Sequence, residues 1–392
     1  MRYNTPARRV LAEFYPPKRT ISQSPASITE VTHPPEGSIS DSPVSITEAT
    51  HISGSPVSVT EVTHPPKGST SGSPVSITEV THISSYNWID ASFPTIAVPG
   101  SPALWTPPKE PTLKVRKDVG RYFISQNTAR YPKSPLEPLF RALYLEHPTF
   151  DIRSIDLVSD RGTLRRLLAF INPSLEIGKQ KKSFRILVEV KKNTALFQYH
   201  DERIIQHVRP DDFQGYGREF EKAFTTELVQ RSTGHHGIVS YRLGGLKLMV
   251  RHELDGYTSS SHEPTHLFPV DVPDRVENTS ALTVRKAGHT VPRESTLEIK
   301  TCRAKQRGTY RISKILPQLW FSQTPKLVRA SYRTEGLFTV PEVEDVTARM
   351  KEWEERHNAD LHRFVMLLKD IIAAVKENGN KATVHYDYKR KS

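Results

Sequence analysis

The stretch Leu246-Lys247-Leu248-Met249-Val250-Arg251-His252-Glu253-Leu254-Asp255 is a strand-like run, half of it apolar, with two acids at its end. It follows Gly244-Gly245, and a second apolar run, residues 238–243, precedes the two glycines. Apolar runs on both sides of a glycine pair predict a β-hairpin. Glu253 and Asp255 are two positions apart, so a strand would place both carboxylates on one face.

A second acidic motif, Glu298-Ile299-Lys300, closes another strand-like run 45 residues after Glu253. If the two strands are neighbours, three carboxylates and one lysine share a small patch. Such oxygen ligands are typical of sites that bind Mg²⁺ or Mn²⁺, and a lysine beside them can face the negative charge of a phosphodiester transition state. The motifs therefore indicate metal-dependent phosphodiester hydrolysis. The alternative is a surface ladder of salt bridges.

Composition bounds the class of protein and its partners. The 392 residues include 30 prolines, many of them before Pro111, and carry a formal charge of +12. A basic balance favours a polyanionic partner such as nucleic acid, with a merely basic soluble surface as the alternative. The single cysteine, Cys302, excludes an internal disulfide and fits a reducing compartment, so we expect a nuclear or cytoplasmic protein. No apolar run is long enough to span a membrane, and no membrane partner is expected.

The N-terminal region contains an internal repeat of the form Ser-Pro-(Ala/Val)-Ser-(Ile/Val)-Thr-Glu-(Val/Ala)-Thr-His. Its four units begin at Ser24, Ser42, Ser55 and Ser73. Each unit offers only two or three small aliphatic side chains, too few for a stacked solenoid. We therefore expect a disordered low-complexity tail over residues 1–85 and a folded domain over residues 86–388, with a polar insertion at about 258–296.

Patterning in the folded part mixes strands with helices. Residues 184–191 and 193–199 read as a pair of strands, and residues 216–230 have helical spacing, with Phe220 and Phe224 four apart. Further predicted elements are helices at 132–146 and 312–322, a strand at 325–332, a long helix at 343–377 broken near Asn358, and a last strand at 382–387. This order predicts an α+β fold with a mixed central β-sheet flanked by helices.

Five short motifs follow one another along the chain. They are Asp160-Arg161-Gly162-Thr163-Leu164, Gly217-Arg218-Glu219-Phe220-Glu221, the Glu-x-Asp at Glu253, the Glu-x-Lys at Glu298, and Gln318, seven residues before Pro325. In type and order they resemble the motifs of the decapping exonuclease family, the DXO and Rai-type enzymes, which act on defective RNA 5′ ends. The resemblance covers about residues 86–388 and implies that the mixed central sheet is of the PD-(D/E)xK-nuclease-like type.

The resemblance implies a role for each matched residue. The implied ligands of a divalent cation, Mg²⁺ or Mn²⁺, are Glu221, Glu253, Asp255, Glu298 and the carbonyl of Ile299. Lys300 and Gln318 would orient the attacking water and the scissile phosphate, with Glu221 as a further catalytic residue. Arg161 would bind the RNA 5′ phosphate, a task that suits a planar, permanently charged guanidinium. The alternative for Arg161 is a place on a solvated basic face of its helix.

Other polar groups are weaker candidates. Basic residues that could contact phosphates, or could simply be solvated, are Lys179, Lys181, Lys182, Arg303, Lys305 and Arg307. His235-His236 precede the strand at 238–243 without a carboxylate or cysteine at ligand spacing, so we expect a pair of loop histidines.

The resemblance therefore implies a metal-dependent RNA 5′-end hydrolase that removes incomplete or non-standard caps, with 5′→3′ exonuclease activity as an additional option. RNA 5′ ends and a nuclease partner protein are the partners it implies. Two alternatives stay open: a catalytically silent nucleic-acid or protein-binding module on the same fold, and a nuclease directed at DNA that shares the site chemistry.

Overall fold

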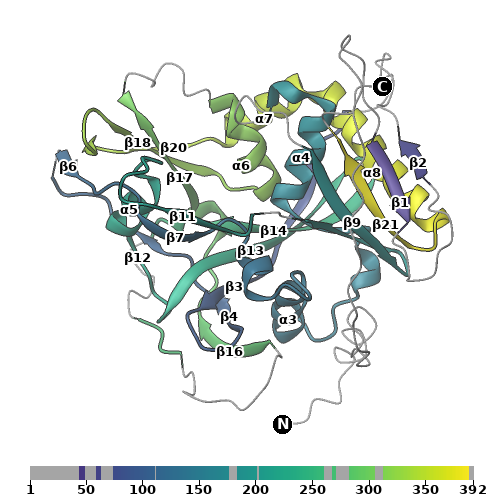
Figure 1. Cartoon of the computed structure of the whole chain (residues 1–392), viewed down its shortest axis with the longest axis horizontal. Coiled ribbons are helices and arrows are strands. Elements are labelled where there is room, and N and C mark those ends of the chain that lie inside the picture. The colour runs from purple at the N-terminus through teal and green to yellow at the C-terminus, as the bar shows by residue number, and fades with distance from the viewer. Residues whose placement is uncertain are drawn as a thin grey trace.

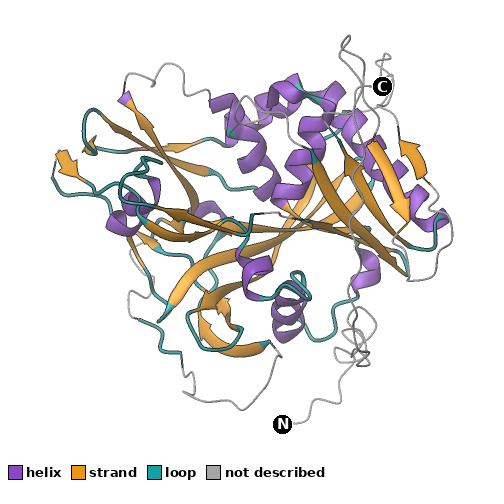
Figure 2. Ribbon diagram, viewed as in Figure 1, coloured by secondary structure: helices purple, strands orange, loops and turns teal. Residues whose placement is uncertain are grey.

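The chain folds into two large β-sheets with helices packed on them, as the computed structural model in Figure 1 and Figure 2 shows. The structure describes residues 44–48, 59–62, 74–110, 112–175, 183–200, 203–259, 267–270, 282–304 and 312–387. Within these ranges the predicted α+β class with a mixed central sheet is confirmed.

The first sheet crosses the middle of the molecule (Figure 1). In chain order its strands are β1 (Val44–Glu48), β2 (Val59–Val62), β3 (Ile77–Ile89), β4 (Thr95–Gly100), β8 (Leu157–Asp160), β9 (Phe184–Lys191), β10 (Thr194–Tyr199), β13 (Ser232–Leu243), β14 (Leu246–Leu254), β16 (Thr283–Gly288) and β21 (Lys381–Tyr386). Their spatial order is β16-β4-β3-β13-β14-β8-β10-β9-β21-β1-β2, and β8 runs parallel to both β14 and β10. Because β8 and β14 are parallel, their carboxyl ends lie side by side.

The second sheet is smaller and contains the Glu-x-Lys strand. Its strands are β5 (Leu104–Trp105), β6 (Thr112–Lys114), β12 (Thr225–Thr226), β15 (Gly256–Tyr257), β17 (Thr296–Arg303), β18 (Lys326–Tyr332), β19 (Leu337–Thr339) and β20 (Glu342–Asp345). The order is β12-β5-β15-β17-β18-β19-β6, with β20 paired to β18, and a separate pair joins β7 (Gly120–Phe123) to β11 (Ile205–Val208). Only Asp255 separates β14 from β15, so the chain passes from one sheet to the other at the Glu-x-Asp motif.

The helices of the described ranges are α2 (Gln126–Arg130), α3 (Glu137–Glu146), α4 (Arg161–Ile171), α5 (Gly217–Phe224), α6 (Leu316–Ser322), α7 (Thr347–Arg356) and α8 (Asn358–Glu377). Helices lie within each of the four predicted helical ranges, and α2 and α4 are additional to them. The predicted break near Asn358 is confirmed, but β20 occupies the start of the helix predicted from residue 343. None of these helices is long and apolar enough to cross a membrane.

Alternate residues of the first sheet point into two different apolar cores. Leu248 and Val250 of β14 pack in one cluster with side chains of α4, α6, α7 and α8, whereas Met249 packs with α3 on the opposite face. This is the two-residue period of a strand that is buried on both sides. Figure 1 accordingly shows α3 on one side of the sheet and the other four helices on the far side.

A third apolar cluster fixes α5 on the second sheet. Phe220 and Phe224, whose ring centroids are 4.5 Å apart, pack with Leu297 and Ile299 of β17. The helix ends at Phe224, because Thr225 is extended and starts β12, so the helix predicted to reach residue 230 is too long. Since the odd-numbered residues of β17 face α5, Glu298 and Lys300 extend from the opposite face of the strand.

The predicted hairpin around Gly244-Gly245 is confirmed as β13 and β14. Both glycines have positive φ, 56° and 87°, as a type I′ turn requires. A Cβ atom on Gly244 would also lie 2.6 Å from Val365 Cγ1 of α8. Glycine is needed at position 244 both for its backbone conformation and for this close approach.

The boundary predicted at residue 86 lies too far along the chain. β3 begins at Ile77, inside the repeat unit that starts at Ser73, and pairs with β13. β1 and β2 also come from repeat units and extend the first sheet beyond β21. Within the predicted insertion, β16 pairs with β4, while residues 260–266 and 271–281 lie outside the described residues. Residues 1–43, 49–58 and 63–73 of the predicted tail also lie outside the described ranges.

A buried ion pair joins the last residue of β8 to β14. The Arg251 side chain is 1% exposed, and its Nε and Nη2 donate to Asp160 Oδ1 and Oδ2 at 2.6 and 2.8 Å. Its Nη1 also donates to the carbonyl of Pro135 at 2.6 Å. This pair fixes Asp160, and therefore the next residue, Arg161, at which α4 begins.

We predict that Asp160→Asn lowers the free energy of unfolding by about 2–4 kcal/mol, because it leaves the buried Arg251 guanidinium without a counter-charge. Urea unfolding followed by tryptophan fluorescence measures this loss. The control is Glu335→Gln, which breaks the exposed pair with Lys114 and should cost no more than about 0.5 kcal/mol. Equal losses in the two variants would contradict this role of the buried pair.

Candidate active site

The candidate site lies where the two sheets meet. Asp255 Oδ2 accepts a hydrogen bond from the backbone N–H of Ile299 at 2.7 Å, which holds β17 beside the end of β14. The antiparallel pairing of Gly256 with Leu297, continued by one residue, places Asp255 opposite Glu298. The two acidic motifs are therefore neighbours, as their sequence predicted. Asp255 itself is a junction residue rather than the strand residue expected, because β14 ends at Leu254.

Glu298 is the buried centre of the site, with a side chain only 2% exposed. Its Oε2 is 3.2 Å from Arg161 Nη1, and its Oε1 accepts hydrogen bonds from Lys300 Nζ and Gln318 Nε2. Burial opposes the charged form of Glu298, but Lys300 and Arg161 outweigh it and lower the pKa of this carboxyl to about 2. A carboxylate enclosed in this way does not belong to a surface ladder of salt bridges.

Asp255 and Glu221 hold their protons more tightly than ordinary carboxyls do. Burial, followed by the charge of Glu298, raises the pKa of Asp255 to about 7. Burial and the charge of Asp255 raise the pKa of Glu221 well above its usual value. Glu253, exposed on β14, adds its charge to both effects. The four predicted acids thus interact with one another, and they repel.

Lys300 is the positive group of this cluster. Burial alone would lower the pKa of Lys300, but the carboxylates of Glu298 and Asp255 outweigh it and raise this pKa above the usual value for lysine. The lysine is therefore charged at neutral pH and lies against the buried acid. Its neighbour along the strand, Ile299, has its carbonyl on the backbone between Glu298 and Lys300, the position that the resemblance assigns to a ligand.

Two arginines from α4 complete the polar wall opposite β17. Arg161 is 12% exposed and contacts Glu298, so it does not lie on a solvated face. Arg165, one turn further along, donates from Nη1 to Gln318 Oε1 at 3.2 Å and so orients the amide whose Nε2 meets Glu298. The sequence motifs gave Arg165 no role. Its spacing of four residues from Arg161 is the signal that could have found it.

Arg218 is a second residue that the sequence predictions did not assign. It lies on α5 within the same motif as Glu221, and its charge acts against the raised pKa of that carboxyl. Its guanidinium is 4.5 Å from the ring centroid of Tyr122 on β7. Arg218 therefore connects the acidic cluster to the surface around β7.

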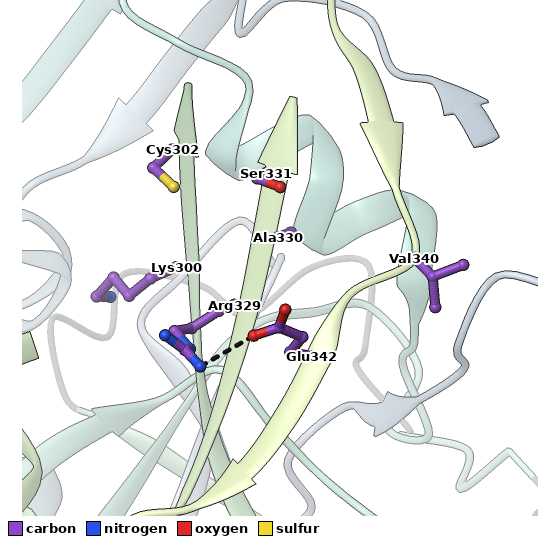
Figure 3. Close-up of a pocket in the computed structure, with 7 residues that line it drawn as sticks. All are labelled: Lys300, Cys302, Arg329, Ala330, Ser331, Val340 and Glu342. Atoms are coloured by element: carbon purple, nitrogen blue, oxygen red, sulfur yellow. Dashed lines mark hydrogen bonds and ion pairs between the residues drawn. The ribbon is translucent and has the colours of Figure 1, made fainter. Parts of the chain in front are cut away.

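A hollow opens beside Lys300 on the exposed face of β17 and β18 (Figure 3). Its lining residues are Lys300, Cys302, Arg329, Ala330, Ser331, Val340 and Glu342. Arg329 Nη2 donates to Glu342 Oε2 at 2.9 Å, the contact drawn as a dashed line in Figure 3. Lys300 is the residue that this hollow shares with the acidic cluster.

Three other groups of predicted residues have different outcomes. His235 and His236 are buried on β13 and not in a loop, and His236 stacks on Tyr86 with ring centroids 5.1 Å apart. Arg303 lies at the exposed end of β17. The remaining basic candidates, Lys179, Lys181, Lys182, Lys305 and Arg307, lie outside the described residues.

The donor set of the site suits a hard divalent cation. Glu221, Asp255 and Glu298 offer carboxylate oxygens, and the mutual repulsion that raises two of their pKa values is what a bound cation relieves. As the side chains stand, no three His, Cys, Asp or Glu residues in the described ranges form a ready metal-binding group. Glu298 instead takes Lys300 and Arg161 as its positive partners.

Comparison with known proteins places the chain in a family. Residues 58–392 match the family described as Domain of unknown function (DUF8563). The chain belongs to the DUF8563 family. The match begins before β3, in agreement with the early start of the folded region. No curated protein matches this DUF8563 chain.

Solved structures with the same fold are Rai1 proteins. Rai1 of Candida albicans, solved with pU5 and Mn²⁺, is 12% identical, with a TM-score of 0.51 over 80% of this chain and 90% of its own. Rai1 of Scheffersomyces stipitis, solved with (3′-NADP)⁺ and calcium, is 11% identical, with a TM-score of 0.51 over 80% and 87%. The DUF8563 chain therefore has the fold of the Rai-type decapping exonucleases, as its five motifs predicted.

The raised pKa of Asp255 predicts a pH-dependent stability. In the unfolded chain the Asp255 carboxyl has a pKa of 3.8 and loses its proton near that pH, whereas the folded protein holds the proton up to a pH of about 7. Asp255 therefore lowers the free energy of unfolding as the pH rises from about 4 to 7. With a chelator present, Asp255→Asn should be more stable than the original protein at pH 8, by at least about 1 kcal/mol or a few degrees in Tm. The gain should be smaller at pH 5.

Thermal unfolding at the two pH values measures this difference. Glu294→Gln removes an exposed carboxylate just before β17 and is the matched control, with no pH-dependent gain expected. If Asp255→Asn is less stable than the original protein at both pH values, the carboxylate is not held in a repulsive cluster.

Proposed function

We propose that this protein is a metal-dependent hydrolase of RNA 5′ ends that removes incomplete or non-standard caps. The observation that carries the proposal is Glu298. It is a fully buried carboxylate that receives Lys300, Gln318 and Arg161 and lies opposite Asp255. A buried acid with three positive or polar partners next to further acids costs folding energy, and such arrangements are found where chemistry requires them.

The fold supports the substrate class. The Rai1 structures of similar fold hold pU5 with Mn²⁺ in one case and (3′-NADP)⁺ with calcium in the other. Both ligands carry phosphates, and both structures include a divalent cation. A net charge of +12 in this chain suits a polyanionic substrate of the same kind.

Each residue of the site can be given a task. Glu221, Asp255, Glu298 and the Ile299 carbonyl would hold Mg²⁺ or Mn²⁺, with Glu253 at the exposed edge. The bound cation would neutralise phosphate charge and favour a hydroxide nucleophile. Lys300, kept protonated by its neighbours, presents positive charge to a phosphate that enters from the hollow beside it.

Gln318 and the α4 arginines would position the substrate. The amide of Gln318 is held between Arg165 and Glu298 and can orient a water or a phosphate oxygen by hydrogen bonding. Arg161 offers a planar guanidinium for the terminal phosphate. Because Arg161 contacts Glu298 in the present structure, binding a phosphate requires it to share or exchange that contact.

Incubation of capped and 5′-monophosphate RNAs with the protein and Mn²⁺ tests the proposal. We expect product release, measured by gel electrophoresis of end-labelled RNA. Asp255→Ala should lower the rate at least about 100-fold, since it removes a carboxylate that acts at the reacting centre. Its affinity for RNA should stay within a few-fold of the original value.

Glu294→Ala is the matched control, because Glu294 is an exposed carboxylate just before the same strand, β17, and its loss should leave the rate unchanged. If the original protein binds RNA but cleaves none of a range of 5′ ends, the hydrolase proposal is wrong. The protein would then be a binding module without catalytic activity. Cleavage of DNA alone would support the DNA-directed alternative.

A further inference from the structure

A groove beside α5 has a positive net charge, because three basic and two acidic residues line it. Its lining residues are Lys114, Val115, Arg116, Lys117, Val119, Tyr216, Glu219 and Glu335. Lys114 is the last residue of β6, and the next four come from the segment that joins β6 to β7. The others come from the start of α5 and the turn before β19. Figure 1 shows β6, β7 and α5 together at one end of the molecule.

One buried carboxylate fixes the segment between β6 and β7. Asp118 is 7% exposed, and its Oδ1 accepts a hydrogen bond from the backbone N–H of Glu219 at 3.0 Å. The N–H of Asp118 donates to the carbonyl of Gly215 at 2.9 Å. With Asp118 held against the start of α5, its neighbours Arg116 and Lys117 are exposed.

The acids of the groove already have partners. Glu335 pairs with Lys114 at 3.5 Å, and Glu219 pairs with Lys222 at 2.6 Å. In the part of the chain that the structure describes, neither Arg116 nor Lys117 has a carboxylate within salt-bridge distance. These two cations are therefore available to an external anion, and adjacent cations without acids are typical of phosphate contacts.

An exposed aromatic ring stands at the edge of the same groove. Phe213 is 57% exposed and packs edge-on against Tyr216, with ring centroids 5.3 Å apart. Val119, on the other side, is 38% exposed. Cations that follow a backbone, together with an open aromatic face, are the features with which proteins bind single-stranded nucleic acid.

The groove is linked to the acidic cluster through α5. Tyr216 and Glu219 of the groove and Glu221 of the cluster belong to the same helix start. Arg218 lies between them over Tyr122, and its charge reaches Glu221. A nucleic-acid strand whose 5′ end lies at Glu298 would pass the positive charge of Arg218 before it reaches Arg116 and Lys117.

We propose that this groove binds the body of a single-stranded RNA, with Arg116 and Lys117 contacting its phosphates and Phe213 stacking on a base. This inference rests on the proposed function for the position of the 5′ end. The binding itself can be measured without cleavage.

Fluorescence anisotropy with a 3′-labelled 20-nucleotide single-stranded RNA, in the presence of EDTA, provides the test. Losing two phosphate contacts should lower the slope of log K against log salt by about 1.4, which corresponds to roughly 20-fold weaker binding at 0.1 M salt. We expect both changes in Arg116→Ala/Lys117→Ala. Phe213→Ala should weaken binding by a factor that changes little with salt, because stacking releases no counterions.

The control is Lys369→Ala/Lys376→Ala, which removes the same charge from exposed positions of α8, at the opposite end of the molecule in Figure 1. It should bind within about twofold of the original protein. Equal weakening by the two double variants would overturn the inference, as would failure of the original protein to bind RNA or selective binding of a protein partner at the groove. Groove-dependent binding without any cleavage would support the inference while the hydrolase proposal failed.

Discussion

The hydrogen bond from the Ile299 N–H to the Asp255 carboxylate is the contact on which the site depends. Asp255 is the only residue between a strand of the first sheet and a strand of the second, so its side chain fixes how the two sheets meet. The contact places Glu298 and Lys300 on the face of β17 that looks away from α5 and toward Gln318. On the other side, the buried Arg251–Asp160 pair sets the start of α4 and so the position of Arg161.

Charge in this cluster is divided unequally among acids of the same chemical type. Glu298 is kept ionised by Lys300 and Arg161, whereas burial and the charges of neighbouring acids raise the pKa of Asp255 and of Glu221. Carboxyls whose environments move their pKa values in opposite directions are a mark of sites that hold ions or transfer protons. The cost appears as lower stability at neutral pH, which a bound divalent cation would remove.

Local pattern was enough to predict the main elements and the meeting of the acidic motifs. The Gly244-Gly245 turn, the Phe220/Phe224 stripe and the alternation of Glu298 with Lys300 each follow from the period of one element. The failures depended on pairing between distant segments. β3 includes part of a repeat unit whose sequence is too polar to predict folding, and it forms a strand because β13 pairs with it. His235 and His236 are buried because β13 begins before the apolar run at 238–243. Likewise, the contact of Arg165 with Gln318 arises only when α4 packs on α6.

The most direct test of the central claim, that these acids form one cation site, is calorimetric titration of the protein with Mn²⁺ at pH 7. We expect saturable binding that releases protons, because the pKa of Asp255 is about 7 and a bound cation displaces its proton. Binding should be at least about tenfold weaker in both Glu221→Ala and Asp255→Ala. Binding of Mn²⁺ with unchanged affinity and proton release in the Glu221→Ala/Asp255→Ala double variant would contradict the claim.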